Sequence, residues 1–343
     1  MAFRRLLAIG DSITVTNKEC LLSCVLKHWP RVNFPVEITP ILVGATNQVY
    51  RIDDGKKCYY LKSYRRNLQS ALNREHHLLN TLSTELPQVL KPIKTHLNGD
   101  LVCWEGHFYA LFPEAKGEML ESFQLSCTHA REAGIYLARL HHALRAINVT
   151  DFPKMKLCWN GKEWCERLQR ILASVLEVES PDNVDRWAIE RIREQYDYLN
   201  RPDSWHHYVC TTEEQVIHGD FHHYNLFFGK DGQVSEVIDW DLAQRMPVGY
   251  EIARACWYMF RLDLSKTKAF IEGYLSISVL SLARLRDGAN AWAIFADHHI
   301  WALEAVYLHG NQAAKKFIPE QPFEPFLSSW NKVIEHVSYL FEG

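Results

Sequence analysis

The sequence predicts an α+β protein with two lobes, a small β-rich N-lobe followed by a larger and mainly helical C-lobe. Three observations predict this. The first third of the chain holds short β-rich runs divided by polar turns, and most of the remainder has apolar residues at helical spacing. One β-like segment, Gln215–Ile238, interrupts the helical part. The length of 343 residues is sufficient for two such lobes.

The N-lobe is expected at residues 31–115, after an N-terminal helical segment at residues 1–30. Thr16-Asn17-Lys18-Glu19 has the spacing of a capping box and predicts a helix that ends before Pro30. Asp54-Gly55 is typical of a hairpin turn between two strands. Strands are predicted at Val36–Val43, Gln48–Asp53, Cys58–Tyr64, Val89–Thr95 and Leu101–Phe112, and a helix is predicted at Leu68–Leu82.

The C-lobe is expected at residues 116–343, because the pattern becomes helical after Pro113 and Gly117. Apolar side chains at Ala133, Leu137, Leu140 and Leu144 recur at steps of four and three, which predicts a helix with one apolar face. Similar spacing predicts two more helices around Trp164–Val175 and Trp187–Ile192, and further helices follow the β-like segment.

The composition excludes several classes of partner. With 38 Lys and Arg against 41 Asp and Glu, the net charge of −3 provides no basic field for nucleic acid. No apolar run reaches the roughly 20 residues of a membrane helix. The nine cysteines contain no Cys-x-x-Cys pair, which indicates reduced thiols. We therefore expect a cytoplasmic protein with a small-molecule partner and no nucleic-acid or membrane partner; the composition leaves the oligomeric state open.

The β-like segment carries the residues with the clearest chemistry. Asp220 and Asn225 are separated by a short loop, and Asp239 stands at the end of the returning strand, so all three side chains can face one point. A carboxylate together with a carboxamide provides oxygen-only ligands, which suit Mg²⁺. The remaining carboxylate can accept a proton from an attacking hydroxyl.

These residues resemble a known signature. His218-Gly219-Asp220-x4-Asn225 followed by Ile238-Asp239-Trp240-Asp241 is similar to the catalytic motif of aminoglycoside phosphotransferases, choline kinases and type II homoserine kinases. Those are small-molecule kinases with a protein-kinase-like fold. The resemblance implies that Asp220 is the catalytic base and that Asn225 and Asp239 are ligands of Mg²⁺. Whether Asp241 joins the metal site stays open.

The resemblance extends to the N-lobe. Gly44 and Asn47 lie where the family has its nucleotide loop, between the first two strands. Lys62 matches the lysine of the third strand that contacts ATP phosphates, and Glu75 on the next helix can pair with it. Phe112-Pro113-Glu114 would be the hinge whose backbone holds adenine.

Some positions depart from the family pattern or invite another role. Gly44 is the only glycine of the nucleotide loop, and Glu251 stands where the family usually has Asp. We interpret Glu251 and His218 as structural supports of the catalytic loop. His222 and His223 are adjacent in an expected strand and would point to opposite faces, which argues against a shared metal.

The sequence therefore predicts an ATP- and Mg²⁺-dependent kinase that transfers the γ-phosphoryl group to a hydroxyl of a small molecule. The alternative is a catalytically silent, ATP-binding scaffold with the same fold. An amino alcohol, an aminoglycoside, a homoserine-like compound and a sugar all remain open as acceptors. Aromatic and acidic residues of the C-lobe either enclose an amine by cation–π contact or form an aromatic core, and we interpret them first as core. They are Trp257, Tyr258, Trp292, Trp301 and Tyr307, with Asp297 and Glu304.

Overall fold

The structure is a computed structural model and describes residues 22–41, 47–65 and 68–342. These residues form two compact units. The N-lobe takes the described residues up to Asn80 together with Leu90–Ala115. The C-lobe takes Thr81–Val89 and continues from Lys116 to the end of the described chain.

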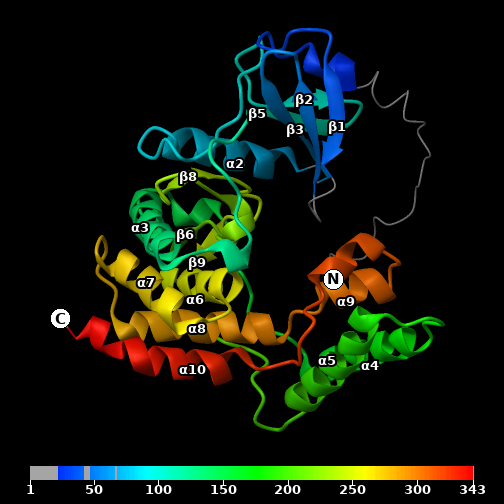
Figure 1. Cartoon of the computed structure of the whole chain (residues 1–343), viewed down its shortest axis with the longest axis vertical. Coiled ribbons are helices and arrows are strands. Elements are labelled where there is room, and N and C mark those ends of the chain that lie inside the picture. The colour runs from blue at the N-terminus through cyan, green and yellow to red at the C-terminus, as the bar shows by residue number, and fades with distance from the viewer. Residues whose placement is uncertain (1–21, 42–46, 66–67, 343) are drawn as a thin grey trace. The chain divides into compact units, whose positions relative to one another are not determined.

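The N-lobe contains a five-stranded antiparallel sheet with the strand order β1-β2-β3-β5-β4 (Figure 1). The hairpin predicted at Asp54-Gly55 joins β2 and β3. Gly55 adopts a φ of 76°, and Oδ1 of Asp54 accepts the N–H groups of Lys56 and Lys57 at 2.9 and 2.8 Å. The strands are β1 (Glu37–Ile41), β2 (Gln48–Asp53), β3 (Cys58–Tyr64), β4 (Val102–Trp104) and β5 (His107–Pro113).

Two predicted strands of the N-lobe are wrong. Val89–Thr95 forms no strand, because Pro92 has no N–H for a ladder, and Ile93 donates a single hydrogen bond to Leu111 at 2.7 Å. The single strand predicted at Leu101–Phe112 is a hairpin of β4 and β5. The chain turns at Glu105-Gly106, where the φ angles of 49° and 78° are both left-handed.

Different segments cover the two faces of this sheet. Because side chains alternate along a strand, Leu61 of β3 points into a core that contains Leu26 and Trp29. Residues 22–26 are helical, as predicted, whereas the capping box at 16–19 lies outside the described residues. Tyr64 points to the other face and packs with Leu72 of helix α2 (Gln69–Leu82). Lys62, two residues before Tyr64, therefore lies on the face that α2 covers.

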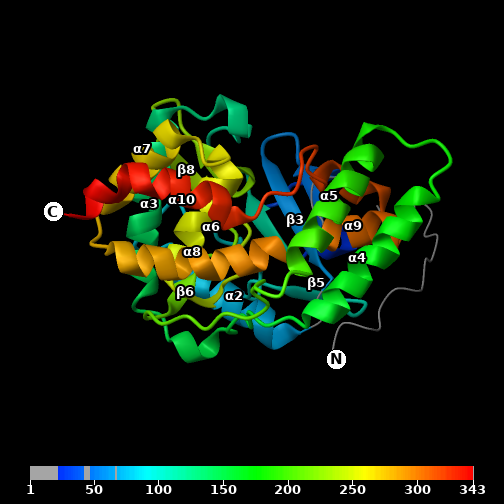
Figure 2. The same ribbon diagram turned by 90° about the horizontal axis from the view of Figure 1, so that it is seen from below.

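The C-lobe is mainly helical. Helices α4, α5 and α9 lie side by side in one group, and α3, α6, α7, α8 and α10 form another (Figures 1 and 2). The helices are α3 (Cys127–Leu144), α4 (Gly161–Leu176), α5 (Asn183–Leu199), α6 (Val248–Phe260), α7 (Leu264–Leu275), α8 (Leu282–Asp297), α9 (Trp301–Tyr307) and α10 (Phe326–Val337). Short 3-10 turns occur at Ser122–Gln124, Val149–Asp151, His223–Asn225, Gln312–Phe317 and Ser338–Phe341. None of the helices in the described part of the chain has the length and apolar character needed to span a membrane.

Two antiparallel strand pairs lie among these helices. Strand β6 (Gln215–Ile217) pairs with β9 (Gln244–Met246), and β7 (Leu226–Phe228) pairs with β8 (Val234–Val237). The β-like segment predicted at Gln215–Ile238 is confirmed, but β9 lies beyond it. Because Ile217 pairs with Gln244, the loop after β6 and the loop before β9 leave this pair at the same end.

Helices α3 and α7 approach each other closely at two glycines. A Cβ on Gly134 of α3 would lie 2.0 Å from the carbonyl oxygen of Phe270. A Cβ on Gly273 of α7 would lie 2.2 Å from the carbonyl oxygen of Arg131. Since both contacts involve backbone atoms, neither can be relieved by rotating a side chain. The glycines therefore set the distance between the two helices.

We expect Gly134→Ala to lower the free energy of unfolding by about 1–3 kcal/mol, because overpacking outweighs the higher helix propensity of alanine. Urea titration of the two proteins measures this difference. Gly99→Ala is the control, since its Cβ would be 3.5 Å from Oγ1 of Thr95, an ordinary contact. A Gly134→Ala protein as stable as the wild type would show that the helices can move apart at no cost.

Candidate active site

The loop after β6 turns sharply at Gly219. Its φ of 81° is left-handed, and a Cβ would lie 2.0 Å from the carbonyl oxygen of Leu242, so only glycine fits. The preceding His218 is fully buried, its Nε2 lies 3.0 Å from the carbonyl oxygen of Ile238, and its Nδ1 accepts the N–H of Asp220 at 3.2 Å. These partners require a neutral ring with its proton on Nε2, and burial lowers the pKa of His218 accordingly. The prediction that His218 supports the loop is confirmed.

Glu251 of α6 binds the backbone of the same loop. The side chain is fully buried, Oε2 accepts the N–H of His218 at 3.1 Å, and Oε1 accepts the N–H of Gly219 at 2.5 Å. Nε2 of His141 lies 2.9 Å from Oε2, and Nδ1 of His141 lies 2.9 Å from the hydroxyl of Tyr274. Burial raises the pKa of Glu251, but His141, the ring of His218 and the amide of Gly219 outweigh it, and the pKa lies below its ordinary value. Glu251 is the structural support that was predicted.

Asp220 follows Gly219 and is held by three side chains. Arg254 of α6 forms an ion pair with Oδ1 of Asp220. Asn225 donates from Nδ2 to Oδ2 at 2.9 Å, and Nε2 of His222 lies 3.4 Å from the same oxygen. Burial raises the pKa of Asp220, but Arg254 and His222 outweigh it and hold the pKa below its usual range. Asp220 is therefore ionised, with 19% of its side chain exposed.

Asn225 and Asp239 lie at the same end of the β7–β8 pair. The N–H of Ile238 donates to the carbonyl oxygen of Asn225 at 3.0 Å, which continues the strand register by one residue. The Nδ2 atom of Asn225 also donates to the carbonyl oxygen of Asp220 at 2.9 Å, so its Oδ1 faces away from that bond. Asp239 is exposed and adopts a φ of 63°.

The donor atoms at this point fit a hard cation. A carboxamide oxygen and an exposed carboxylate suit Mg²⁺, which keeps several water molecules and binds phosphate oxygens in addition to one or two protein ligands. Among residues 22–41, 47–65 and 68–342, no group of three His, Cys, Asp or Glu side chains could hold a metal. The carboxamide of Asn225 and the carboxylate of Asp239 are thus ligand types that a hard cation such as Mg²⁺ accepts.

The N-lobe brings together two of the predicted nucleotide residues. Nζ of Lys62 lies 3.9 Å from Oε1 of Glu75, and their side chains are only 13% and 10% exposed. The ammonium group also lies 5.1 Å from the centre of the Tyr64 ring. The pairing of a β3 lysine with an α2 glutamate, anticipated from the sequence, is present.

The other predicted nucleotide residues are spread over the N-lobe. Gly44 lies outside the described residues. Oδ1 of Asn47 accepts the N–H of Arg65 at 3.2 Å and so connects the chain before β2 to the end of β3. Phe112 is half-buried at the end of β5, and the exposed Glu114 follows that strand, one residue before the N-lobe ends at Ala115.

Sequence reasoning missed two side chains that contact Asp220: Arg254, which lies outside the motif, and His222, at one of its variable positions. A signal for Arg254 was present in the sequence. Residues three apart on a helix share a face, so an arginine three residues after Glu251 points to the same loop. His222 was considered only as a metal ligand, whereas its ring lies beside the carboxylate of Asp220.

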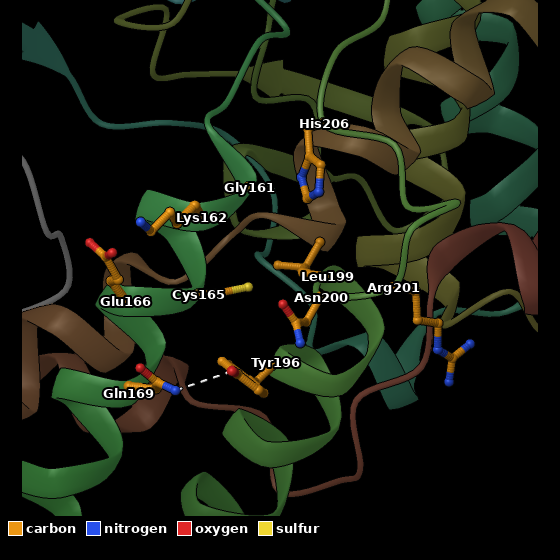
Figure 3. Close-up of a pocket in the computed structure, with 10 residues that line it drawn as sticks. All are labelled: Gly161, Lys162, Cys165, Glu166, Gln169, Tyr196, Leu199, Asn200, Arg201 and His206. Carbon is orange, nitrogen blue, oxygen red and sulfur yellow. Dashed lines mark hydrogen bonds between the residues drawn. The ribbon is translucent and has the colours of Figure 1, made fainter.

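A hollow of about 480 Å³ lies between α4 and α5 (Figure 3). Among its lining residues, Nε2 of Gln169 donates to the hydroxyl of Tyr196 at 3.1 Å. The lining residues are Gly161, Lys162, Cys165, Glu166, Gln169, Tyr196, Leu199, Asn200, Arg201 and His206. None of the predicted site residues lines this hollow, so it does not change the assignment.

Comparison with known proteins is consistent with this geometry. The phosphotransferase enzyme family matches residues 37–288. The chain belongs to this family. It is a phosphotransferase that acts on an alcohol group. No curated protein matches the sequence.

Solved structures show the fold of this phosphotransferase. Spectinomycin phosphotransferase APH(9)-Ia, in complex with ADP and spectinomycin, is 13% identical with a TM-score of 0.60, and the match covers 94% of this chain and 98% of that one. Amicoumacin kinase hAmiN, with AMP-PNP and Ca²⁺, is 16% identical with a TM-score of 0.58, covering 91% and 97%. A microcompartment-associated aminopropanol kinase is 17% identical with a TM-score of 0.58, covering 95% and 98%. The predicted two-lobed fold is confirmed.

We expect Glu251→Gln to lower the free energy of unfolding by about 2–4 kcal/mol, because charge-assisted hydrogen bonds to two amides and His141 are weakened. The pKa of Glu251 is lowered in the folded protein, so its stabilising contribution is present above the ordinary pKa of 4.5 and is lost as the pH falls through the folded-state pKa. Urea unfolding from pH 6 down to about pH 3 should show this loss in the wild type and less of it in the variant.

Glu251→Asp is the matched control, because it keeps the charge and has the residue that the family usually shows. It should retain more stability than Glu251→Gln at pH 7. Equal stability of Glu251→Gln and wild type at pH 7 would contradict the assigned role.

Proposed function

We propose that this phosphotransferase is an ATP- and Mg²⁺-dependent kinase that transfers the γ-phosphoryl group to a hydroxyl of a small molecule. The main support is the catalytic loop, in which an ionised Asp220 stands beside Asn225 and a solvent-exposed carboxylate, Asp239, lies at the end of the neighbouring hairpin. The structures of similar fold that contain AMP-PNP or ADP give additional support for a nucleotide donor.

Asp220 would act on the acceptor hydroxyl. Its carboxylate accepts a hydrogen bond from that hydroxyl and orients the oxygen. As the new O–P bond forms and the bond between the γ-phosphorus and the β,γ-bridging oxygen breaks, the hydroxyl proton passes to Asp220. Because the transition state of phosphoryl transfer is loose, the proton leaves late and a weak base suffices. The low pKa that Arg254 imposes on Asp220 is compatible with this role.

The remaining site residues would hold the donor. Asn225 and Asp239 would bind Mg²⁺, which when bound neutralises phosphate charge. Lys62, oriented by Glu75, would contact the phosphates. Gly44 and Asn47 would belong to the loop that covers them, and the backbone of Phe112–Glu114 would bind adenine.

One observation favours the alternative of a catalytically silent ATP-binding protein. Both carboxylate oxygens of Asp220 have protein partners, Arg254 on Oδ1 and Asn225 on Oδ2. A carboxylate oxygen has two lone pairs, however, so each can accept a further hydrogen bond from an acceptor hydroxyl. Turnover rather than nucleotide binding separates the two proposals.

We expect Asp220→Asn to reduce phosphate transfer by at least about 100-fold, because asparagine cannot take the hydroxyl proton. Nucleotide affinity should change little. The measurement is ADP release with a panel of amino alcohols, hydroxy acids, sugars, aminoglycosides and macrolides, alongside nucleotide titration. Asp231→Asn, in the exposed turn between β7 and β8, is the matched control. Unchanged transfer by Asp220→Asn would refute the assigned base.

We expect Asp239→Ala to raise the Mg²⁺ concentration needed for half-maximal activity by about 10-fold or more, because one charged ligand is lost. The left-handed φ of 63° at this position adds strain to alanine, so Asp239→Asn, which tolerates that conformation, separates strain from ligand loss. Asp241→Ala, assayed in the same way, tests whether Asp241 joins the metal site. A wild-type Mg²⁺ dependence in Asp239→Ala would refute the metal assignment.

A further inference from the structure

Arg254 has a hydrogen-bonding group that the protein does not use. The residue is 7% exposed, and its Nη2 pairs with Asp220. Its Nη1 is buried and has no hydrogen-bond partner among the residues that the structure describes. A buried donor without a partner is unfavourable, because it has lost its hydrogen bonds to water. The guanidinium therefore has, beside Asp220, a nitrogen, Nη1, whose two N–H groups have no protein partner in the described part of the chain.

Aromatic rings fix the direction of this donor. The guanidinium carbon of Arg254 lies 4.6 Å from the ring centre of Tyr258 and 5.5 Å from that of Trp292. Trp292 is 1% exposed and packs edge-on against Tyr250, with ring centres 5.5 Å apart. Because the guanidinium is planar and lies against both rings, Nη1 cannot turn away from this position without giving up the pair of Arg254 with Asp220.

Positive charge predominates around this point. The charged groups that act most strongly on the hydroxyl of Tyr258 are, in order, Arg254, Asp220, Arg261 and Arg191, and three of these four are positive. Burial, together with the charges of Arg254 and Arg191, lowers the pKa of the neighbouring His299 to about 4, so that ring adds no charge of its own at neutral pH.

The two carboxylates that the sequence suggested for binding an amine, Glu304 and Asp297, already have partners within the protein. Glu304 accepts two hydrogen bonds from Arg167, at 2.8 and 2.6 Å. Asp297 accepts the N–H of Phe326 at 3.0 Å and the hydroxyl of Tyr198 at 3.1 Å, and burial raises its pKa to about 7.

One of the aromatic residues near them belongs to the core. Trp292 contacts Tyr250, Phe295 and Phe326, and Trp257 contacts Phe326 edge-on. Trp292 is therefore a core residue, as first interpreted, whereas Trp257, Tyr258, Trp301 and Tyr307 are half-buried.

We propose that the acceptor carries an anionic group, a carboxylate or a phosphate ester, a few bonds from the hydroxyl that is phosphorylated, and that Nη1 of Arg254 binds this group while Asp220 receives the hydroxyl. Arg254 presents adjacent nitrogens, one to Asp220 and one to the ligand, so a short acceptor reaches both. The inference rests on the proposed function and specifies its substrate class.

The first test compares matched acceptors on the wild-type protein. The pairs are L-serine with L-serinamide, D-glycerate with glycerol, and glycerol 3-phosphate with glycerol; 1-amino-2-propanol and kanamycin are the cationic compounds. We expect kcat/KM for at least one anionic acceptor to exceed that of its uncharged counterpart and of both cations by about 10- to 100-fold. The carboxylate and phosphate pairs distinguish the two sources of charge.

A preference for the amide, for glycerol or for a cation would overturn this inference and leave the proposed kinase function standing. Transfer to none of these compounds or of the wider panel, by a protein that binds ATP, would contradict the proposed function itself and the inference with it.

The second test uses Arg254→Gln and Arg254→Lys with the best matched pair. If Arg254 binds the anion, Arg254→Gln raises KM for the anionic acceptor and removes its advantage, whereas Arg254→Lys retains part of it. Equal losses on both members of the pair would mean that Arg254 only positions Asp220, which would overturn the inference. Arg170→Gln, an exposed arginine of α4, is the matched control, and thermal unfolding and nucleotide affinity report whether each variant is folded.

Discussion

The site depends on one buried charge. Glu251 is fully excluded from water, and an ionised carboxylate in that position costs several kcal/mol unless nearly all of its lone pairs are used. The N–H groups of His218 and Gly219, together with His141, provide this compensation. The same bonds fix two consecutive peptide units of a loop that has no strand partner at that point. The loop can therefore carry Gly219 in a left-handed conformation and place the next side chain, Asp220, beside Arg254.

Two side chains of helix α6 bind that loop, one at its backbone and one at the carboxylate of Asp220. Glu251 and Arg254 are three residues apart and so share a face, one holding the peptide groups before Asp220 and the other its carboxylate. The two interactions are physically coupled, because a shift of α6 moves both. A buried carboxylate beside a buried guanidinium is stable only as a pair, and removing either member leaves an uncompensated charge. The position of the base thus depends on the packing of one helix, whereas Asp239 follows the β7–β8 hairpin; Asn225 links the two, because its Nδ2 donates to Asp220.

The extent to which the sequence predicted this structure follows from how local each signal is. β2 and β3 were predicted with their observed bounds, because alternation and the Asp54-Gly55 turn lie within the segment itself. The segment Val89–Thr95 was read wrongly because its apolar composition resembles a strand, while the absence of a donor at Pro92 outweighs it. In the site, the motif identified Asp220 and its neighbours in the chain. It did not identify Arg254. The contact between Arg254 and Asp220 depends on how the helices pack, and a short sequence motif does not encode that packing.

The same distinction explains why the sequence predicts the residues for the phosphoryl donor better than those for the acceptor substrate. The groups assigned to the donor lie in strands and turns with local signatures, so their types could be listed from the sequence. For the acceptor, counting Asp297 and Glu304 beside aromatic residues suggested an amine, but a count does not show which charges are already satisfied. Once Arg167 takes Glu304 and backbone and tyrosine groups take Asp297, the unsatisfied hydrogen-bonding atom beside Asp220 is a guanidinium nitrogen of Arg254. We infer that the choice of acceptor depends on the polar groups that have no partner within the protein, and beside Asp220 this group is a positively charged hydrogen-bond donor.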